Sequence, residues 1–423
     1  MHYARLIFTA CLIALAGGCA KMTLAWADLT GGGQAAAPPL FAGAPPTVED
    51  WERKQAPAIR ATLEAYVYGA MPDASSTEVI SQRTINANAI GGEGVLDEYQ
   101  LVASATFGGE TRSTKPFFID VLLPADASGP VPVIIIESFC PRTSVIPGEE
   151  VNRLEEGDFC EGDGFRSSLM RYIFGRYIST PPIEMILEHG YAVAAIYPSE
   201  AVPDEREQGL EALAGLSAGH LEDETRWGAV AAWGWLFSRV VDVLETDDRL
   251  DSTGMIVWGH SRYGKAALVA AAWDPRIDAV IAHQSGTGGA SLNRRKKGES
   301  VGAITRDYPH WFSAKYAEMA GRENELPIDQ HDLLALIAPR PVLLGNARRD
   351  VWSDPNGAFR AAKAASAAYA LYGSKGLDQT RLDSFDPQAD ISFWIRPGTH
   401  GVVKEDWPAF LDFLDARYKS PKS

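Results

Sequence analysis

Short apolar runs bounded by turn-forming residues recur along the chain and predict the strands of one sheet. The runs cover 117–123, 131–136, 191–197, 255–258, 279–282, 341–345 and 391–395. Unbroken apolar runs of this length are typical of strands buried on both faces, and such strands form mostly parallel sheets. The intervals between the later runs, such as 223–246, have the length and apolar spacing of helices. This alternation predicts an α/β fold.

The remaining segments predict how this sheet is extended. Residues 47–68 have apolar positions at helical spacing, and 79–107 alternate loosely, as antiparallel strands at a sheet edge do. The sequence shows no internal repeat, so we expect a single catalytic domain over 47–423. A long insertion at 144–177, first acidic and then basic, could cover part of its site.

The N-terminus has the pattern of an export signal. An arginine precedes an apolar stretch, 6–16, that is too short to span a membrane comfortably. We expect 1–27 to be removed as a signal peptide and 28–46, which is rich in Gly, Ala and Pro, to be a flexible leader. Cys19 lies in a sequence that resembles a lipoprotein box, so a lipid anchor is one alternative and an uncleaved anchor another. Either way, we expect a periplasmic or extracellular protein.

Export bears on the cysteines, because disulfides form in oxidising compartments. After cleavage only Cys140 and Cys160 would remain, and they flank a loop rich in Pro, Gly, Asp and Glu. We expect a disulfide between them that closes this loop. Two free, buried thiols are the alternative.

Charge and motifs also exclude several kinds of partner. The formal net charge is −16, whereas nucleic acids and anionic membranes attract basic surfaces. The sequence has no H-E-x-x-H motif and no paired cysteine spacing that would indicate a metal site. The glycine-rich segment 286–289 lacks the lysine of a phosphate loop and is interpreted as a tight active-site loop. We therefore expect no cofactor, and we also expect a monomer.

The segment 255–269 carries the strongest chemical signal. An apolar run leads into Ser261, which lies between Gly259 and Gly264, and an Ala/Leu-rich helical pattern follows. A strand, a sharp turn and a helix expose the nucleophilic serine of α/β-hydrolases. Glycines suit such a turn, because a Cβ atom would clash there. An ordinary turn with a serine N-cap is the alternative.

A nucleophilic serine needs a base, and the base needs an acid. In the α/β-hydrolase fold these partners follow the serine in the order acid, histidine. His400 fits the base, since it comes after the last predicted strand and before a closing helix, 405–418. Asp350 fits the acid, because it lies just past the strand 341–345. Asp354 is the alternative acid, although its place before a proline suits a helix cap.

The neighbour of the serine, Arg262, and the remaining histidines after it are interpreted as follows. The backbone N–H of Arg262, and also its guanidinium, could stabilise an oxyanion beside the serine, with a surface salt bridge as the alternative. We expect His283 and His331 to satisfy local hydrogen bonds and His310 to lie among aromatic residues.

With these residues identified, the chain resembles the bacterial glucuronoyl esterases of carbohydrate esterase family 15. The resemblance covers most of the mature chain, and its most specific segments are 259–265, 283–290 and 350–355. It implies an α/β-hydrolase three-layer sandwich, with helices on both faces of a mostly parallel sheet. It also implies cofactor-free hydrolysis of esters between glucuronic acid on xylan and lignin alcohols.

The resemblance also implies roles for individual residues. Ser261 would be the nucleophile, His400 the base and Arg262 an oxyanion donor, while Lys265, Glu299 and Trp352 would contact the sugar. These assignments are chemically sensible, because charged groups bind hydroxyls and an indole covers a sugar face.

One position departs from the family pattern. Many members have a glutamate where this chain has Gln284, and that glutamate can act as the triad acid. A glutamine carries no charge, so this task should fall to Asp350. We count Gln284 among the residues facing the substrate.

Together these observations predict a serine esterase acting on (4-O-methyl-)glucuronate esters. One alternative is another carbohydrate esterase, such as an acetyl xylan esterase. A second is a hydrolase-like carbohydrate-binding protein without turnover, although an intact Ser, Asp and His set favours an enzyme.

Overall fold

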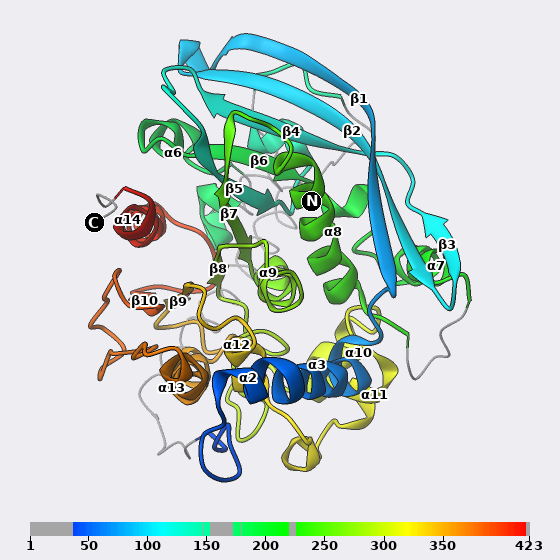
Figure 1. Cartoon of the computed structure of the whole chain (residues 1–423), viewed down its shortest axis with the longest axis vertical. Coiled ribbons are helices and arrows are strands. Elements are labelled where there is room, and N and C mark those ends of the chain that lie inside the picture. The colour runs from blue at the N-terminus through cyan, green and yellow to red at the C-terminus, as the bar shows by residue number, and fades with distance from the viewer. Residues whose placement is uncertain (1–36, 147, 153–171, 179, 220–225, 420–423) are drawn as a thin grey trace, which may run out of the picture.

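The fold is built on one ten-stranded sheet. We describe residues 37–146, 148–152, 172–178, 180–219 and 226–419 of a computed structural model (Figure 1). The strands run in the order β1-β2-β4-β6-β5-β7-β8-β9-β10, and β3 pairs with β2. Their bounds are β1 (Ala74–Ala89), β2 (Gly94–Phe107), β3 (Glu110–Ser113), β4 (Phe117–Pro124), β5 (Val131–Glu137), β6 (Ala192–Ile196), β7 (Leu250–His260), β8 (Ala279–His283), β9 (Val342–Ala347) and β10 (Ile391–Arg396).

The pairing confirms a mostly parallel central sheet. The six strands from β6 to β10 along this order are parallel to one another. β1, β2, β3 and β4 are joined by antiparallel pairs, and β4 is also antiparallel to β6. The long β1–β2 ribbon therefore forms the antiparallel edge that the alternation in 79–107 predicts.

Helices occupy both sides of the sheet. A continuous helical segment is formed by α2 (Val48–Asp50), η1 (Trp51–Gln55), α3 (Ala56–Leu63) and η2 (Glu64–Tyr68), as predicted for 47–68. The other helices are α4 (Arg142–Val145), α6 (Ile183–Glu188), α7 (Arg206–Leu216), α8 (Ala229–Leu244), α9 (Arg262–Trp273), α10 (Val301–Asp307), α11 (Ala314–Glu318), α12 (Gln330–Ala335), α13 (Pro355–Leu371) and α14 (Asp406–Tyr418). Short 3₁₀ turns are η3 (Ile90–Gly92), η4 (Arg176–Ile178), η5 (Pro198–Glu200) and η6 (Glu323–Glu325).

Two apolar cores confirm the three-layer sandwich. On one face α8, α9, α12 and α13 pack against strand residues such as Ile135 and Val257. On the other face α6 and α14 cover Ile134 and Ile256. Figure 1 shows α6 and α14 on one side of the central strands and α8 and α9 on the other. Successive strand residues enter opposite cores, which explains why each strand reads as an unbroken apolar run.

The leader is only partly described. Residues 37–46 contain no helix or strand, but Leu40 and Phe41 pack against the core, and the Phe41 ring meets Trp51 edge-on at 5.8 Å. This part of the predicted leader thus contacts the first helix through a large aromatic side chain, and the flexibility of the leader stays a prediction. The predicted signal peptide and Cys19 lie outside the described residues.

Other predictions also reach beyond the described residues. Most of the predicted insertion, 153–171, lies outside them. Cys140 is disulfide-bonded, and Cys160 lies in that same segment, so their pairing stays a prediction. Within the described part of the chain, no helix is both long and apolar enough to cross a membrane.

Candidate active site

Ser261 occupies a strained turn between β7 and α9. Its φ and ψ angles are 55° and −117°, in a region that L-residues rarely adopt. A Cβ atom on Gly259 would lie 2.1 Å from the carbonyl oxygen of Tyr263, so only glycine fits there. The Ser261 side chain makes no capping hydrogen bond to α9. These features match a nucleophile elbow and not the alternative of a serine N-cap.

Asp350 and His400 come together from the ends of two neighbouring parallel strands. Asp350 lies on the loop after β9, and His400 lies on the loop after β10. Asp350 Oδ2 is 2.7 Å from His400 Nδ1, and its Oδ1 accepts a hydrogen bond from the Ser353 N–H at 3.2 Å. Burial would raise the pKa of Asp350, but His400 and the Ser353 hydrogen bonds outweigh it and hold this pKa below its usual value. The carboxylate is therefore ionised and oriented toward the imidazole.

Asp354 has a different role from Asp350. It is the N-cap of α13, and its Oδ1 accepts a hydrogen bond from the Gly357 N–H at 3.0 Å. The structure thus agrees with the expectation that Asp354 is a capping residue. No contact to His400 is found for it among the described residues.

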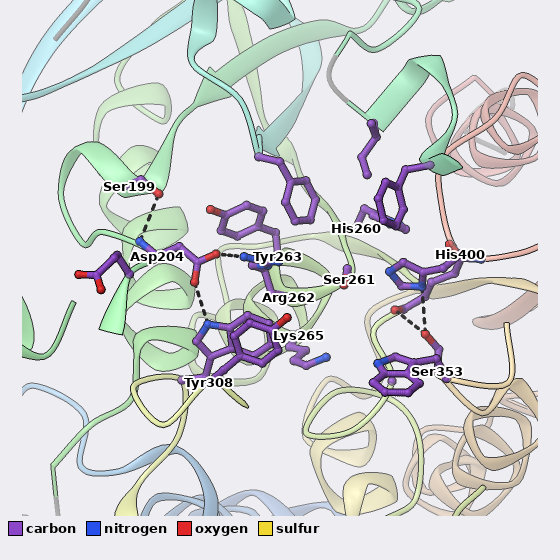
Figure 2. A pocket seen from close by; sticks show the side chains of 18 of the residues that line it. Ser199, Asp204, His260, Ser261, Arg262, Tyr263, Lys265, Tyr308, Ser353 and His400 are labelled. Carbon is purple, nitrogen blue, oxygen red and sulfur yellow. Dashed lines mark hydrogen bonds and ion pairs between the residues drawn. The ribbon is translucent and has the colours of Figure 1, made fainter. Parts of the chain in front are cut away.

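Ser261 and His400 line one cavity of about 770 Å³ together with Arg262 (Figure 2). In the described part of the chain no hydrogen bond joins Ser261 Oγ to the imidazole. Such catalytic contacts are often long before substrate binds. The shared cavity gives a substrate carbonyl access to both side chains.

Arg262 is neither on the surface nor unpaired. Its Nη1 forms an ion pair with Asp204, and its side chain is 24% exposed. Nε is buried without a hydrogen-bond partner among the described residues. Nε is therefore out of reach of a ligand, but the guanidinium both forms a salt bridge and lines the cavity. The Arg262 backbone N–H lies in the first turn of α9, where helix donors have no partner within the helix.

Three residues that we expected to contact a sugar line the same cavity. Lys265 is buried, and its Nζ donates to the carbonyl of Ser285 at 2.5 Å. Burial lowers the pKa of Lys265 to about 8, even though nearby Glu299 favours the charged form. Trp352 is 54% exposed, and its Nε1 donates to Glu299 Oε1 at 3.1 Å. A cation, an acceptor and an open indole face are thus available to one ligand.

Gln284 also lines the cavity, but its amide is already engaged by the loop that carries His400. Its Oε1 accepts a hydrogen bond from the Gly401 N–H at 2.8 Å, and its Nε2 donates to the Thr399 carbonyl at 3.3 Å. Thr399 and Gly401 directly precede and follow His400, so these bonds hold the backbone on both sides of it. Gln284 therefore positions the base, and its amide atoms are occupied before any substrate arrives.

The other histidines have distinct environments. His283 Nδ1 lies 3.2 Å from Nδ1 of the buried His260, as expected of a residue with local hydrogen bonds. His310 lies beside the ring of Trp311, at 6.3 Å between centroids, which agrees with its predicted aromatic surroundings. The expectation for His331 is wrong, because its Nδ1 is buried without a partner in the described residues and its Nε2 is 3.9 Å from Asp332 Oδ2, too far for a hydrogen bond.

Several contributors to the site were not predicted from the sequence. Ser353 Oγ lies 3.3 Å from His400 Nδ1, and the His260 ring is 4.6 Å from the His400 ring, between centroids. Asp204 comes from the loop after β6, far from the motif segments. His260, which directly precedes the serine, and Ser353, which lies within the segment 350–355, could have been found from their positions. In the described part of the chain no cluster of His, Cys, Asp or Glu is suited to hold a metal ion.

Comparisons with known proteins identify the family of the chain. Over 379 residues the chain is 34% identical to "Carbohydrate esterase MZ0003" from an unknown prokaryotic organism, covering 87% of this chain and 85% of the relative. It is also similar to the solved structure of a glucuronoyl esterase from Solibacter usitatus, with a TM-score of 0.73 and 32% identity over 88% of this chain and 94% of that one. The chain belongs to the glucuronoyl esterases of carbohydrate esterase family 15.

Further matches show which residues of this glucuronoyl esterase match the family model, and that its fold is similar to that of another solved structure. The family model described as "Glucuronyl esterase, fungi" matches residues 217–373, which contain the elbow and the acid loop. A promiscuous esterase of the same family, from a marine bacterial metagenome, has a TM-score of 0.76 and 31% identity over 92% of this chain and 98% of that one. The protein is therefore a carboxylic ester hydrolase with the α/β-hydrolase fold.

Proposed function

We propose that this esterase hydrolyses esters of glucuronic acid, with or without a 4-O-methyl group, and a bulky alcohol. Such esters link glucuronoxylan to lignin. The observation that carries the proposal is the Asp350–His400 pair, which opens into the same cavity as Ser261, Lys265 and the indole of Trp352. Its curated relatives include a 4-O-methyl-glucuronoyl methylesterase of Hypocrea jecorina, 36% identical over 156 residues and 34% of each chain.

Acylation begins when Ser261 Oγ attacks the C6 carbonyl carbon of the glucuronate ester. His400 accepts the serine proton at Nε2, because Nδ1 is engaged by Asp350. The negative charge on the carbonyl oxygen is stabilised by the Arg262 backbone N–H and guanidinium. When the C–O bond to the alcohol breaks, His400 returns the proton to the departing alkoxide, and a glucuronoyl ester of Ser261 remains.

Deacylation repeats these steps with water. His400 takes a proton from the water, the hydroxide adds to the C6 carbon, and the Ser261–acyl bond breaks. The proton then returns to Ser261 Oγ. The products are regenerated enzyme and glucuronic acid, which releases its carboxyl proton to solvent at neutral pH, so atoms and protons balance without a cofactor.

The cavity wall favours a uronic acid over a small acyl group. Lys265 can donate to sugar hydroxyls, Glu299 can accept from them, and the open face of Trp352 can cover the ring. An acetyl group would use none of these groups. The cavity, with a volume of about 770 Å³, is also much larger than an acetyl group needs.

Kinetics on two substrates test this proposal. Benzyl glucuronate should be hydrolysed with a far higher kcat/KM than acetylated xylan, and Ser261→Ala should abolish the reaction. Labelling of Ser261 by a fluorophosphonate separates an enzyme from a binding protein. Equal or higher rates on acetylated xylan would favour the acetyl esterase alternative, and full activity of Ser261→Ala would refute the mechanism.

We also propose that the protein is exported. The apolar N-terminal stretch and the disulfide-bonded Cys140 support this placement. N-terminal sequencing of the protein recovered from the periplasm or medium tests it. A mature chain beginning near residue 28 is expected, whereas a lipid-modified Cys19 would show the anchored alternative.

A further inference from the structure

The guanidinium of Arg262 is held by one carboxylate from a distant loop. Asp204 lies between η5 and α7, in the segment that follows β6. Its Oδ2 forms the ion pair with Arg262 Nη1, and Figure 2 shows the two side chains pointing at each other in the wall of the cavity. The Asp204 side chain is 13% exposed and lines the cavity.

Asp204 is itself fixed by three further groups. Its Oδ1 accepts hydrogen bonds from Trp311 Nε1 at 2.8 Å and from His310 Nε2 at 3.1 Å. Its backbone N–H donates to Ser199 Oγ at 3.4 Å. A carboxylate with these partners on both oxygens has little freedom to rotate. It therefore offers Arg262 an acceptor at a defined place.

Aromatic rings enclose the rest of the Arg262 head group. Its central carbon lies 4.8 Å from the centre of the Trp311 ring, 5.2 Å from that of Phe139 and 5.8 Å from that of Tyr308. Such ring faces attract a cation without accepting conventional hydrogen bonds. Apart from the buried Nε, the N–H groups not used by Asp204 are thus left for another acceptor.

We propose that Asp204 is a positioning residue for catalysis: it orients Arg262 so that the guanidinium N–H groups on the cavity side are aimed at the developing oxyanion. The inference rests on the proposed function of Arg262. A long, flexible arginine stabilises a transition state well only if its donors are in place before the reaction. Trp311 contributes in two ways: its indole N–H donates to Asp204, and its ring faces the Arg262 guanidinium.

The test compares variants of Asp204 that keep the shape or the charge. Asp204→Asn keeps the shape but weakens the contact to Arg262, and Asp204→Glu keeps the charge but moves it by one methylene. Both should lower kcat on benzyl glucuronate by about 10- to 100-fold, with KM changed by less than about threefold, because displaced oxyanion donors act in the transition state. Thermal melting shows whether each variant is folded, and either one suffices for the test.

Asp242→Asn is the matched control. Asp242 is also a partly buried aspartate, in ion pairs with Arg239 and Arg276, and it does not line the cavity. This variant should keep kcat within about twofold of the parent, since exposed or partly exposed ion pairs affect stability only modestly. A similar loss of kcat in it would show that disrupting any such pair impairs the enzyme, and would overturn the proposal.

A double-mutant cycle shows whether Asp204 acts through Arg262. Arg262→Ala alone should reduce kcat by about 10²- to 10³-fold, as loss of one oxyanion donor does. Adding Asp204→Asn to that variant should change kcat by less than about twofold, because coupled residues are not additive. Additive losses, or normal kcat in the folded Asp204 variants, would overturn the positioning role. If instead Arg262→Ala keeps full activity, the proposed function of Arg262 has failed, which is a distinguishable result.

Discussion

His400 Nδ1 and Asp350 Oδ2 lie 2.7 Å apart although 50 positions separate the two residues in the chain. The contact exists because β9 and β10 are parallel neighbours, so the loops after them leave the same edge of the sheet. A carboxylate on Nδ1 keeps the proton on that nitrogen and leaves Nε2 free to act as a base. The pair therefore sets the tautomer as well as the orientation of the imidazole.

Replacing Asp350 by Asn should remove this effect. The amide can donate to Nδ1 and so favours the wrong tautomer, and it cannot stabilise an imidazolium. We expect kcat to fall by about two to four powers of ten, by analogy with other triad acids. Steady-state kinetics on a benzyl or methyl glucuronate ester measure this loss.

Asp354→Asn is the control for that substitution. Asp354 caps α13, and asparagine is also a good capping residue, so both stability and kcat should stay close to those of the parent. Near-normal activity of Asp350→Asn, together with a large loss in Asp354→Asn, would show that the acid has been assigned to the wrong residue.

Replacing Gln284 should lower kcat and leave KM nearly unchanged. Gln284→Ala removes both hydrogen bonds that bracket His400, so the base loop loses its support. We expect kcat to fall by roughly tenfold with KM nearly unchanged, since small displacements of a catalytic group are costly. A raised KM with normal kcat would instead show that the amide contacts the substrate, as the sequence led us to expect.

The residues predicted from the sequence share local signals. Ser261 lies in a strand–turn–helix pattern, and His400 and Asp350 directly follow apolar strands. The order of the parallel strands then brings them to one edge of the sheet. Long apolar runs, buried on both faces, also made the fold predictable.

The residues that were missed have no such local pattern. Asp204 reaches Arg262 across 58 positions, from the loop between η5 and α7. Ser353 is an ordinary serine until the loop folds back onto His400. The docking of Phe41 depends in the same way on a tertiary contact with Trp51. Contacts of this kind are decided by packing, which composition and periodicity do not record.

Lys265 should give the enzyme an alkaline limit. Its pKa is lowered to about 8, chiefly because burial disfavours the charged form. The ammonium is therefore present below that pH and lost above it. If it donates to sugar hydroxyls, kcat/KM on a glucuronate ester should fall as the pH rises through about 8.

Lys265→Met tests whether this limb belongs to the lysine. The variant should have a low kcat/KM that no longer declines between about pH 7 and pH 9, since no titrating group remains at this position. The pH profile should be recorded for both proteins with the same ester and at constant ionic strength. An unchanged alkaline limb in Lys265→Met would assign it to another group.

Trp352 should contribute to binding through two separable parts, its ring and its N–H. Trp352→Phe keeps an aromatic face but deletes the hydrogen bond to Glu299, and Trp352→Ala deletes both. We expect KM for a glucuronate ester to rise about threefold in the first and about tenfold or more in the second, with kcat less affected, because sugar stacking supplies binding energy. Trp235→Phe is the matched control, because its indole N–H also donates to a side chain, Ser75, but lies outside the cavity. That control should leave KM unchanged, and an unchanged KM in Trp352→Ala would remove this residue from the sugar site.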